Sequence, residues 1–181
     1  MNTVKSYPFV DLFAGPCGLG EGFSSLISAS GNSSFEGVIS IEHDEAAHQT
    51  LLLRHFFRSF PRENVPNEYY AYINNEITLE SLFSSYPEQH EKALQTAKCI
   101  SLGAENHKTI RSLVKDRIDA RERWALLGGP PCQAYSLVGR SRMTVNADFE
   151  DDERHFLYRE YLRVIADNEP PVFVMENVKG L

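Results

Sequence analysis

Residues 7–22 have the sequence YPFVDLFAGPCGLGEG. The first seven, residues 7–13, are mostly apolar, which predicts a buried strand. The glycine-rich residues that follow predict a tight turn, and a helix is expected over 18–28. A strand, a glycine-rich turn and a helix in this order form the opening unit of a parallel α/β sheet.

The same alternation of strand and helix continues along the chain. Continuously apolar strands of this kind are typical of sheets that are covered on both faces. The pattern predicts an α/β fold with a doubly wound, mainly parallel sheet that ends, within these 181 residues, after its fifth strand. The further strands are predicted at 35–42, 99–102, 124–127 and 172–175, and the helices at 43–57, 78–83, 88–98, 107–123 and 153–167, with the rest of 61–87 in a loop.

The composition suits one compact domain of 181 residues, with 42% hydrophobic and 24% charged residues. No long apolar run predicts a membrane span, and the first six residues lack the apolar core of a signal peptide, so a cytoplasmic protein is expected. The net charge of −7 is unfavourable for binding DNA phosphates. Composition alone therefore favours a small-molecule enzyme, unless the phosphate-binding surface is local or lies on another part of the polypeptide.

The three cysteines, Cys17, Cys99 and Cys132, lie far apart in the sequence and form no CxxC pair. An odd number of cysteines without metal-ligand spacing argues against a disulfide framework and against a zinc site. No metal site is predicted.

Ligands of parallel α/β sheets bind beyond the carboxyl ends of the strands. The residues that follow Phe13, Ile41, Leu127 and Met175 are therefore expected to share one edge of the sheet. In the first of these segments the glycines do not follow the GxGxxG dinucleotide pattern, because Phe23 stands where the third glycine belongs. This disfavours a nicotinamide cofactor, and leaves either another ligand or a purely structural turn.

The second segment is Glu42, His43 and Asp44. A carboxylate that closes the second strand is placed to accept hydrogen bonds from ribose hydroxyls, and Glu42 is the better candidate because it comes first. His43 could pack on an adenine face. Asp44 fits the N-cap of the helix that follows, a structural role.

The third segment, GGPPCQAYS at 128–136, is the most specific. Two prolines stiffen the backbone before Cys132, which would hold a thiol at the edge of the sheet. Only a thiolate attacks well, and Arg140 and Arg142 are possible sources of an activating positive field. The fourth segment places Glu176 directly after the last strand, as a candidate acid for a bound ring. The alternatives are an inert buried cysteine and a surface glutamate.

Taken together, the four segments resemble the signature motifs of the cytosine-C5 DNA methyltransferases, in the order of that family. DLFAGPCGLGEGF (11–23) resembles the motif that binds S-adenosylmethionine, IEHD (41–44) the strand end at the ribose, and GGPPCQAYS the nucleophile loop. FLYREYL (156–162) and VMENVKG (174–180) resemble the helix and the Glu-Asn motif that follow. The resemblance covers the first part and the last third of the chain, but not residues 61–123.

The resemblance implies a Rossmann-like methyltransferase fold and assigns roles to individual residues. The catalytic residues are Cys132, Glu176 and Asn177. The residues implied to bind S-adenosylmethionine are Phe13, Ala14, Gly15, Gly18, Glu42, His43, Pro130 and Leu157, and those implied to bind the substrate are Pro131, Gln133, Ser136, Arg140 and Arg142.

The implied reaction begins when Cys132 attacks C6 of cytosine while Glu176 protonates N3. C5 then accepts the methyl group, and loss of its proton expels the cysteine. The implied substrate is double-stranded DNA, whose target base must be flipped out of the helix. The protein would then associate with the nucleoid if it is bacterial.

The chain departs from the family pattern at three points. Cys17 stands where the family usually has a glycine, and the acidic residue expected after the third strand has only Glu105 as a candidate. The later Gln-x-Arg-x-Arg motif and the target-recognition domain have no counterpart in residues 1–181. The resemblance therefore implies a second chain that supplies these parts. A tRNA cytosine-C5 methyltransferase and a non-catalytic cofactor-binding subunit remain as alternatives.

Overall fold

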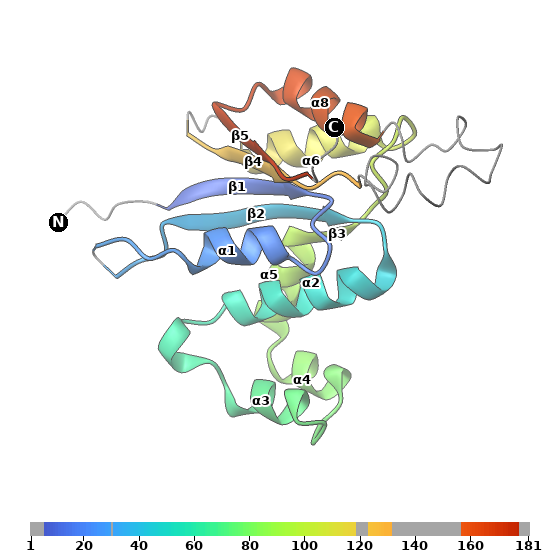
Figure 1. Ribbon diagram of the computed structural model, residues 1–181. Helices are drawn as coiled ribbons and strands as arrows, with labels where there is room; N and C mark the ends of the chain where they lie inside the picture. Colours follow the sequence, from blue (N-terminus) through green and yellow to red (C-terminus); the bar gives the residue numbers. More distant parts are fainter. Residues whose placement is uncertain (1–5, 30, 119–122, 132–156, 178–181) are drawn as a thin grey trace, which may run out of the picture.

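The computed structural model describes residues 6–29, 31–118, 123–131 and 157–177 (Figure 1). The described residues form a five-stranded sheet in the order β3-β2-β1-β4-β5, in which every pair of neighbours is parallel. The strands are β1 Tyr7–Leu12, β2 Phe35–Glu42, β3 Ala97–Cys99, β4 Ala125–Gly128 and β5 Val172–Met175. The helices are α1 Gly18–Ser25, α2 Glu45–Arg58, α3 Asn67–Ile73, α4 Leu79–Ser85, α5 Pro87–Thr96, α6 His107–Ile118 and α8 Leu157–Asn168, with one 3-10 turn at Arg62–Asn64. The predicted α/β class and parallel sheet are confirmed.

The register of the sheet brings the ends of the strands to one edge. Leu12 at the end of β1 pairs with Ile41 on one side and with Gly128 on the other. Gly128 in turn pairs with Met175 at the end of β5. The segments that follow these strands therefore leave the sheet side by side, as the sequence predicts. We call this side of the sheet, where the carboxyl ends of the strands lie, the carboxyl edge. The opposite side, where the strands begin, is the amino edge.

Helices cover both faces of the sheet, with α6 and α8 on one face and α1 and α2 on the other (Figure 1). Alternation along each strand explains the arrangement, because successive side chains point to opposite faces. Val10 and Leu12 belong to the core under α6 and α8, whereas Phe9 packs with Leu19 and Phe23 of α1. Burial on both faces explains why β1 and β4, in the interior of the sheet, are mostly apolar.

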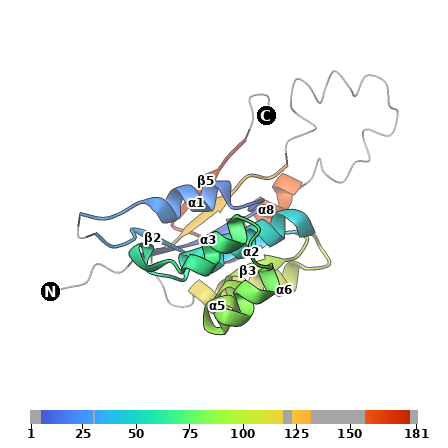
Figure 2. The ribbon, with the colours of Figure 1, turned by 90° about the horizontal axis from the view of Figure 1, so that it is seen from below.

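Two predicted elements differ from the structure. Helix α3 lies in the stretch predicted as loop, where it forms a lobe with α4 at the end of the molecule farthest from α8 (Figure 1). Figure 2 shows the molecule from this end, with α3 toward the viewer. It is held by aromatic packing, with the Tyr69 ring centroid 4.9 Å from that of Phe57 on α2. The third strand is Ala97–Cys99 instead of 99–102, because the chain leaves the sheet after the hydrogen bond from the Ile100 N–H to the Glu42 carbonyl.

Strand β5 is the outer strand of the described sheet and is exposed along its whole length. Val172 and Phe173 keep 56% and 52% of their surface exposed. An apolar strand with unpaired backbone groups is a template for further strand pairing. Residues 172–175 therefore form an exposed apolar edge strand of the described sheet. Among the described helices, none has the length and apolarity that crossing a membrane requires.

Candidate active site at the carboxyl edge

The turn between β1 and α1 uses a left-handed backbone at three positions. The φ angles are 54° at Phe13, 53° at Gly15 and 71° at Cys17. Such angles cost little at glycine, but they strain a residue with a side chain. Strain of this kind is concentrated at functional sites. The position of Cys17, where the family usually has glycine, thus does require a positive φ.

The side chain of Cys17 points into the core, where only 4% of the residue is exposed. Burial, together with the nearby carboxylates of Asp11 and Glu21, raises the pKa of its thiol to about 12. A thiol with this pKa stays protonated at neutral pH and is a poor nucleophile. Cys17 therefore does not compete for the role predicted for Cys132.

Glu42 ties the end of β2 to the glycine turn. Its carboxylate is buried, and its Oε2 accepts a hydrogen bond of 2.8 Å from the Gly15 N–H. Its Oε1 accepts hydrogen bonds of 2.8 Å from the N–H groups of His43 and Asp44. The Asp44 side chain accepts from the Ala47 N–H at 2.8 Å, which confirms its role as the N-cap of α2. Glu42 thus orders the turn, and its Oε2, which accepts one hydrogen bond here, has a second lone pair to accept from a ligand.

Replacing Glu42 by alanine should weaken cofactor binding and also lower stability. The change leaves three N–H donors without their charged acceptor. Hydrogen bonds to charged groups contribute about 1.5–3 kcal/mol each, but water replaces part of this because His43 and Asp44 are exposed. We expect the free energy of unfolding to fall by about 2–4 kcal/mol. Urea unfolding and equilibrium binding of S-adenosylmethionine measure the two effects. An unchanged dissociation constant would remove Glu42 from the cofactor site.

A small pocket of about 60 Å³ opens beside this turn. Four of the residues predicted to bind the cofactor line it, namely Phe13, Glu42, His43 and Leu157, together with Ile41, Ser101 and Leu102. Ligand sites usually measure about 300–1,000 Å³, so these residues form the floor of a larger site. The sequence prediction missed Ser101 and Leu102 because it placed them inside the third strand. Glu105 is exposed and is not among the lining residues.

The other predicted cofactor residues surround this floor without lining it. Gly15 holds the turn to Glu42, and Gly18 begins α1 at the surface. Ala14 packs into the core, while its N–H donates to the Ile41 carbonyl at 3.0 Å. Pro130 is buried just after β4.

Gly128, at the end of β4, is required by close packing. A Cβ atom at this position would lie 2.5 Å from the Tyr161 ring and 2.8 Å from the Leu12 carbonyl oxygen. The Tyr161 hydroxyl lies 3.2 Å from the Leu126 carbonyl and 3.0 Å from the Val174 carbonyl, so it can donate to either. Tyr161 of α8 therefore fixes β4 and β5 together just before the predicted nucleophile loop.

Glu176 lies against the start of that loop. Its N–H donates to the Gly128 carbonyl at 2.9 Å, and its Oε2 lies 3.1 Å from the position of a Cβ atom built on Gly129. Glu176 is exposed, whereas Asn177 is half-buried. The carboxylate thus stands at the carboxyl edge beside Gly129, which comes three residues before Cys132 in the sequence.

Five predicted residues lie outside the described part of the chain, namely Cys132, Gln133, Ser136, Arg140 and Arg142. Pro131 is half-buried and ends the described segment. Within the described ranges, no group of three or more His, Cys, Asp or Glu side chains is arranged to hold a metal ion.

Asp11 is a buried carboxyl that the sequence prediction did not single out. It is 1% exposed and lies under the glycine turn, where it accepts a hydrogen bond from the Gly20 N–H. Its Oδ2 has no hydrogen-bond partner among the described residues. Burial raises the pKa of Asp11 to about 7. Only its place one residue before the end of β1 could have signalled it, and a polar residue inside an apolar strand has no fixed role.

Comparison with known proteins identifies similarities along the whole chain. Residues 75–181 match the family model described as C-5 cytosine-specific DNA methylase. The chain is 31% identical to the type II methyltransferase M.Bpa9945I of Bacillus paralicheniformis, over 95% of the chain and 40% of that relative. It is 30% identical to the putative type II methyltransferase M.MjaORF1200P of Methanocaldococcus jannaschii, over 96% of the chain and 48% of that relative.

A shorter match is closer in sequence. The chain is 50% identical to the type II methyltransferase M.AquIA of Picosynechococcus over 56 residues, which are 31% of the chain and 20% of that relative. The chain thus spans less than half the length of each of these relatives.

Proposed function

Because this chain belongs to the C-5 cytosine-specific DNA methylase family, we propose that it forms the cofactor-binding and catalytic part of an enzyme that methylates C5 of cytosine in DNA. One observation carries the proposal: Glu176 lies against Gly129 at the same edge of the sheet as the turn held by Glu42. This arrangement supports the proposed roles of Glu176 as the acid, of the segment after Gly129 as the nucleophile loop, and of the turn at Gly15 as the cofactor turn.

The residues at the carboxyl edge fit S-adenosylmethionine, which supplies the methyl group when it is bound. The Gly15 turn allows close approach of the backbone, and α1 presents its N-terminal N–H groups. Glu42 is placed to accept hydrogen bonds from the ribose hydroxyls, while Phe13 and His43 offer flat faces to the adenine. Leu157 of α8 adds an apolar side chain to the pocket floor.

The chemistry at the base is assigned to Cys132, Glu176 and Asn177. C6 of cytosine is a poor electrophile, so attack by the Cys132 thiolate needs simultaneous protonation at N3, which Glu176 provides. The sulfur–carbon bond that forms places electron density on C5, which then accepts the methyl group. Loss of the C5 proton expels the thiolate and restores the ring. Asn177 orients the loop around the base, while Arg140 and Arg142 stabilise the thiolate.

The remaining predicted residues complete the substrate side of the proposal. Pro131, Gln133 and Ser136 flank the nucleophile and would contact the flipped cytosine. Double-stranded DNA is the proposed substrate, and sequence recognition is assigned to polypeptide beyond the length that this chain shares with its relatives. If most DNA contacts are made by that other polypeptide, the net charge of −7 on residues 1–181 does not argue against DNA as the substrate.

Trapping on duplex DNA that contains 5-fluorocytosine tests the proposal. With fluorine at C5 there is no proton to remove from this carbon, so the cysteine cannot be released. The adduct between cysteine and C6 therefore accumulates after methyl transfer. The chain is mixed with a polypeptide that corresponds to the remaining C-terminal part of M.Bpa9945I, with S-adenosylmethionine present. A DNA–protein adduct that maps to Cys132 is expected. An adduct at another residue, or on tRNA but not DNA, would contradict it.

A further inference from the structure

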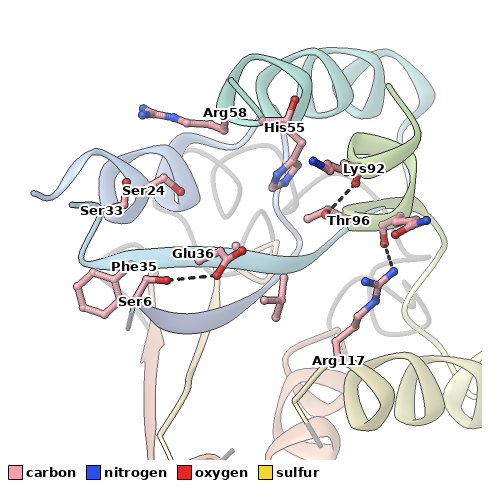
Figure 3. Close-up of a pocket in the computed structure, with 14 residues that line it drawn as sticks. Ser6, Ser24, Ser33, Phe35, Glu36, His55, Arg58, Lys92, Thr96 and Arg117 are labelled. Carbon is pink, nitrogen blue, oxygen red and sulfur yellow. Dashed lines mark hydrogen bonds between the residues drawn. The ribbon is translucent and has the colours of Figure 1, made fainter. Parts of the chain in front are cut away.

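A second and larger pocket lies at the amino edge, away from the proposed active site (Figure 3). It measures about 570 Å³ and is bounded by the beginning of β2 and the last turns of α2, α5 and α6. This volume falls within the range of about 300–1,000 Å³ that is usual for small-molecule sites. The two pockets share no lining residue, because this one is lined by residues 35–38 at the beginning of β2 and the pocket at the carboxyl edge by Ile41 and Glu42 at its end. A ligand of this pocket is therefore not the methyl donor.

The lining of this amino-edge pocket is positive, although the chain as a whole is acidic. It contains Arg58, Lys92 and Arg117, and only one carboxylate, that of Glu36. Glu36 accepts a hydrogen bond of 3.2 Å from the Ser6 hydroxyl. In a chain of net charge −7, three cations in one cavity reverse the local charge.

Two of these cations have an evident structural role. Arg58 lies in the last turn of α2 and forms an ion pair with Glu21. Arg117 lies in the last turn of α6 and donates to the Gln95 carbonyl at 3.3 Å. Basic side chains in the last turn of a helix stabilise it, because they interact favourably with the negative end of the helix dipole. Arg117 has five N–H donors, however, and this contact uses only one of them.

Lys92 has no such role. It lies in the middle of α5, and its ammonium group makes no hydrogen bond or ion pair with any residue in the described ranges. Figure 3 shows its side chain directed into the pocket, toward the same space that His55 enters from α2. Hydroxyl groups of Ser24 and Ser33 line the other side. Ammonium, guanidinium and hydroxyl donors that converge on one cavity are the groups that bind oxyanions.

We propose that this pocket binds a small anionic ligand through a phosphate or carboxylate group, with Lys92 and Arg117 as its principal charged contacts. The ligand neutralises the cations that the fold leaves without a carboxylate. The assignment is independent of the proposed methyl transfer, because it concerns the opposite edge of the sheet.

Calorimetric titration of the full chain with pyrophosphate and with citrate, at low ionic strength, tests this assignment. The pocket variant carries Lys92→Gln and Arg117→Gln. The control carries Lys108→Gln and Lys115→Gln, which remove the same charge from exposed positions on α6 outside the pocket. We expect the pocket variant to bind at least about tenfold more weakly, and the control to stay within about twofold of the unmodified chain.

Each outcome decides the assignment. Binding of pyrophosphate alone identifies a phosphate site, and binding of citrate identifies a carboxylate site. Absence of binding by both anions, or an equal loss in both variants, would overturn the proposal, since equal loss indicates a general charge effect. Thermal unfolding checks that the variants are folded. The ring resonances of His55 provide a second measurement, because they should shift when the unmodified chain is titrated.

Discussion

Replacing Cys132 by serine is expected to abolish methyl transfer while leaving cofactor binding intact. A serine hydroxyl is scarcely ionised near neutral pH, so the covalent step at C6 loses its nucleophile. We expect the rate to fall by at least about 10³-fold, as is usual when a covalent nucleophile is removed. Transfer of a radiolabelled methyl group to duplex DNA measures the rate, with the C-terminal part of the relative supplied. The dissociation constant of S-adenosylmethionine is expected to change little.

Cys99→Ser is the matched control for this experiment. Cys99 is exposed at the end of β3, and its Sγ lies 3.7 Å from the His43 carbonyl. Burial of part of the thiol and the acidic groups near it raise the pKa of Cys99, so it is not an activated nucleophile. The control should keep full activity. Substantial transfer by the Cys132→Ser chain would contradict the covalent mechanism.

The parallel sheet was predictable because its strands are short apolar runs with clear ends. β2 is bounded by Glu42 at its end, and β5 follows a pair of prolines, so both were predicted with the bounds observed. β3 was misplaced because residues 97 and 98 were assigned to the preceding helix, and because Ile100 and Leu102 extend the apolar pattern beyond the hydrogen-bonded part. Apolar sequence marks burial, whereas the strand ends where pairing with β2 ends.

The site was predictable to the extent that it follows from strand ends. Parallel strands carry the residues after them to one edge, which places Glu42 beside the glycine turn and Glu176 beside Gly129. The sequence could not show that Glu42 would accept three backbone hydrogen bonds, because these depend on the three-dimensional path of the turn. Helix α3 was missed for a similar reason. It is stabilised by the packing of Tyr69 on Phe57 of α2, a contact between two segments that the sequence of residues 67–73 alone does not show.

Asp11 gives the stability of the protein a dependence on pH whose sign is unusual for a carboxyl group. Its pKa is about 7 in the folded chain, against 3.8 for the ordinary group, because burial disfavours the charged form. Between these values the folded chain retains a proton that the unfolded chain releases. The contribution of Asp11 to the free energy of unfolding therefore falls as pH rises through this window, by about 1.4 kcal/mol per pH unit.

A second buried group acts in the opposite direction. Burial lowers the pKa of His55 from 6.5 to about 4, so the folded chain resists its protonation. Its contribution is complete above pH 6.5 and is lost as pH falls toward 4. The two slopes partly cancel in the unmodified chain. The effect of Asp11 is therefore visible only by comparison with a variant that keeps His55.

Asp11→Asn provides this comparison. The asparagine oxygen can still accept from the Gly20 N–H, and the side chain carries no charge at any pH. Between pH 5 and pH 8 we expect the variant to gain about 3 kcal/mol in free energy of unfolding relative to the unmodified chain, from two pH units of the window. Urea unfolding followed by circular dichroism measures the difference at each pH. Parallel curves for the two chains would show that Asp11 is already ionised throughout this range, and that a partner for its Oδ2 stabilises the charge beneath the cofactor turn.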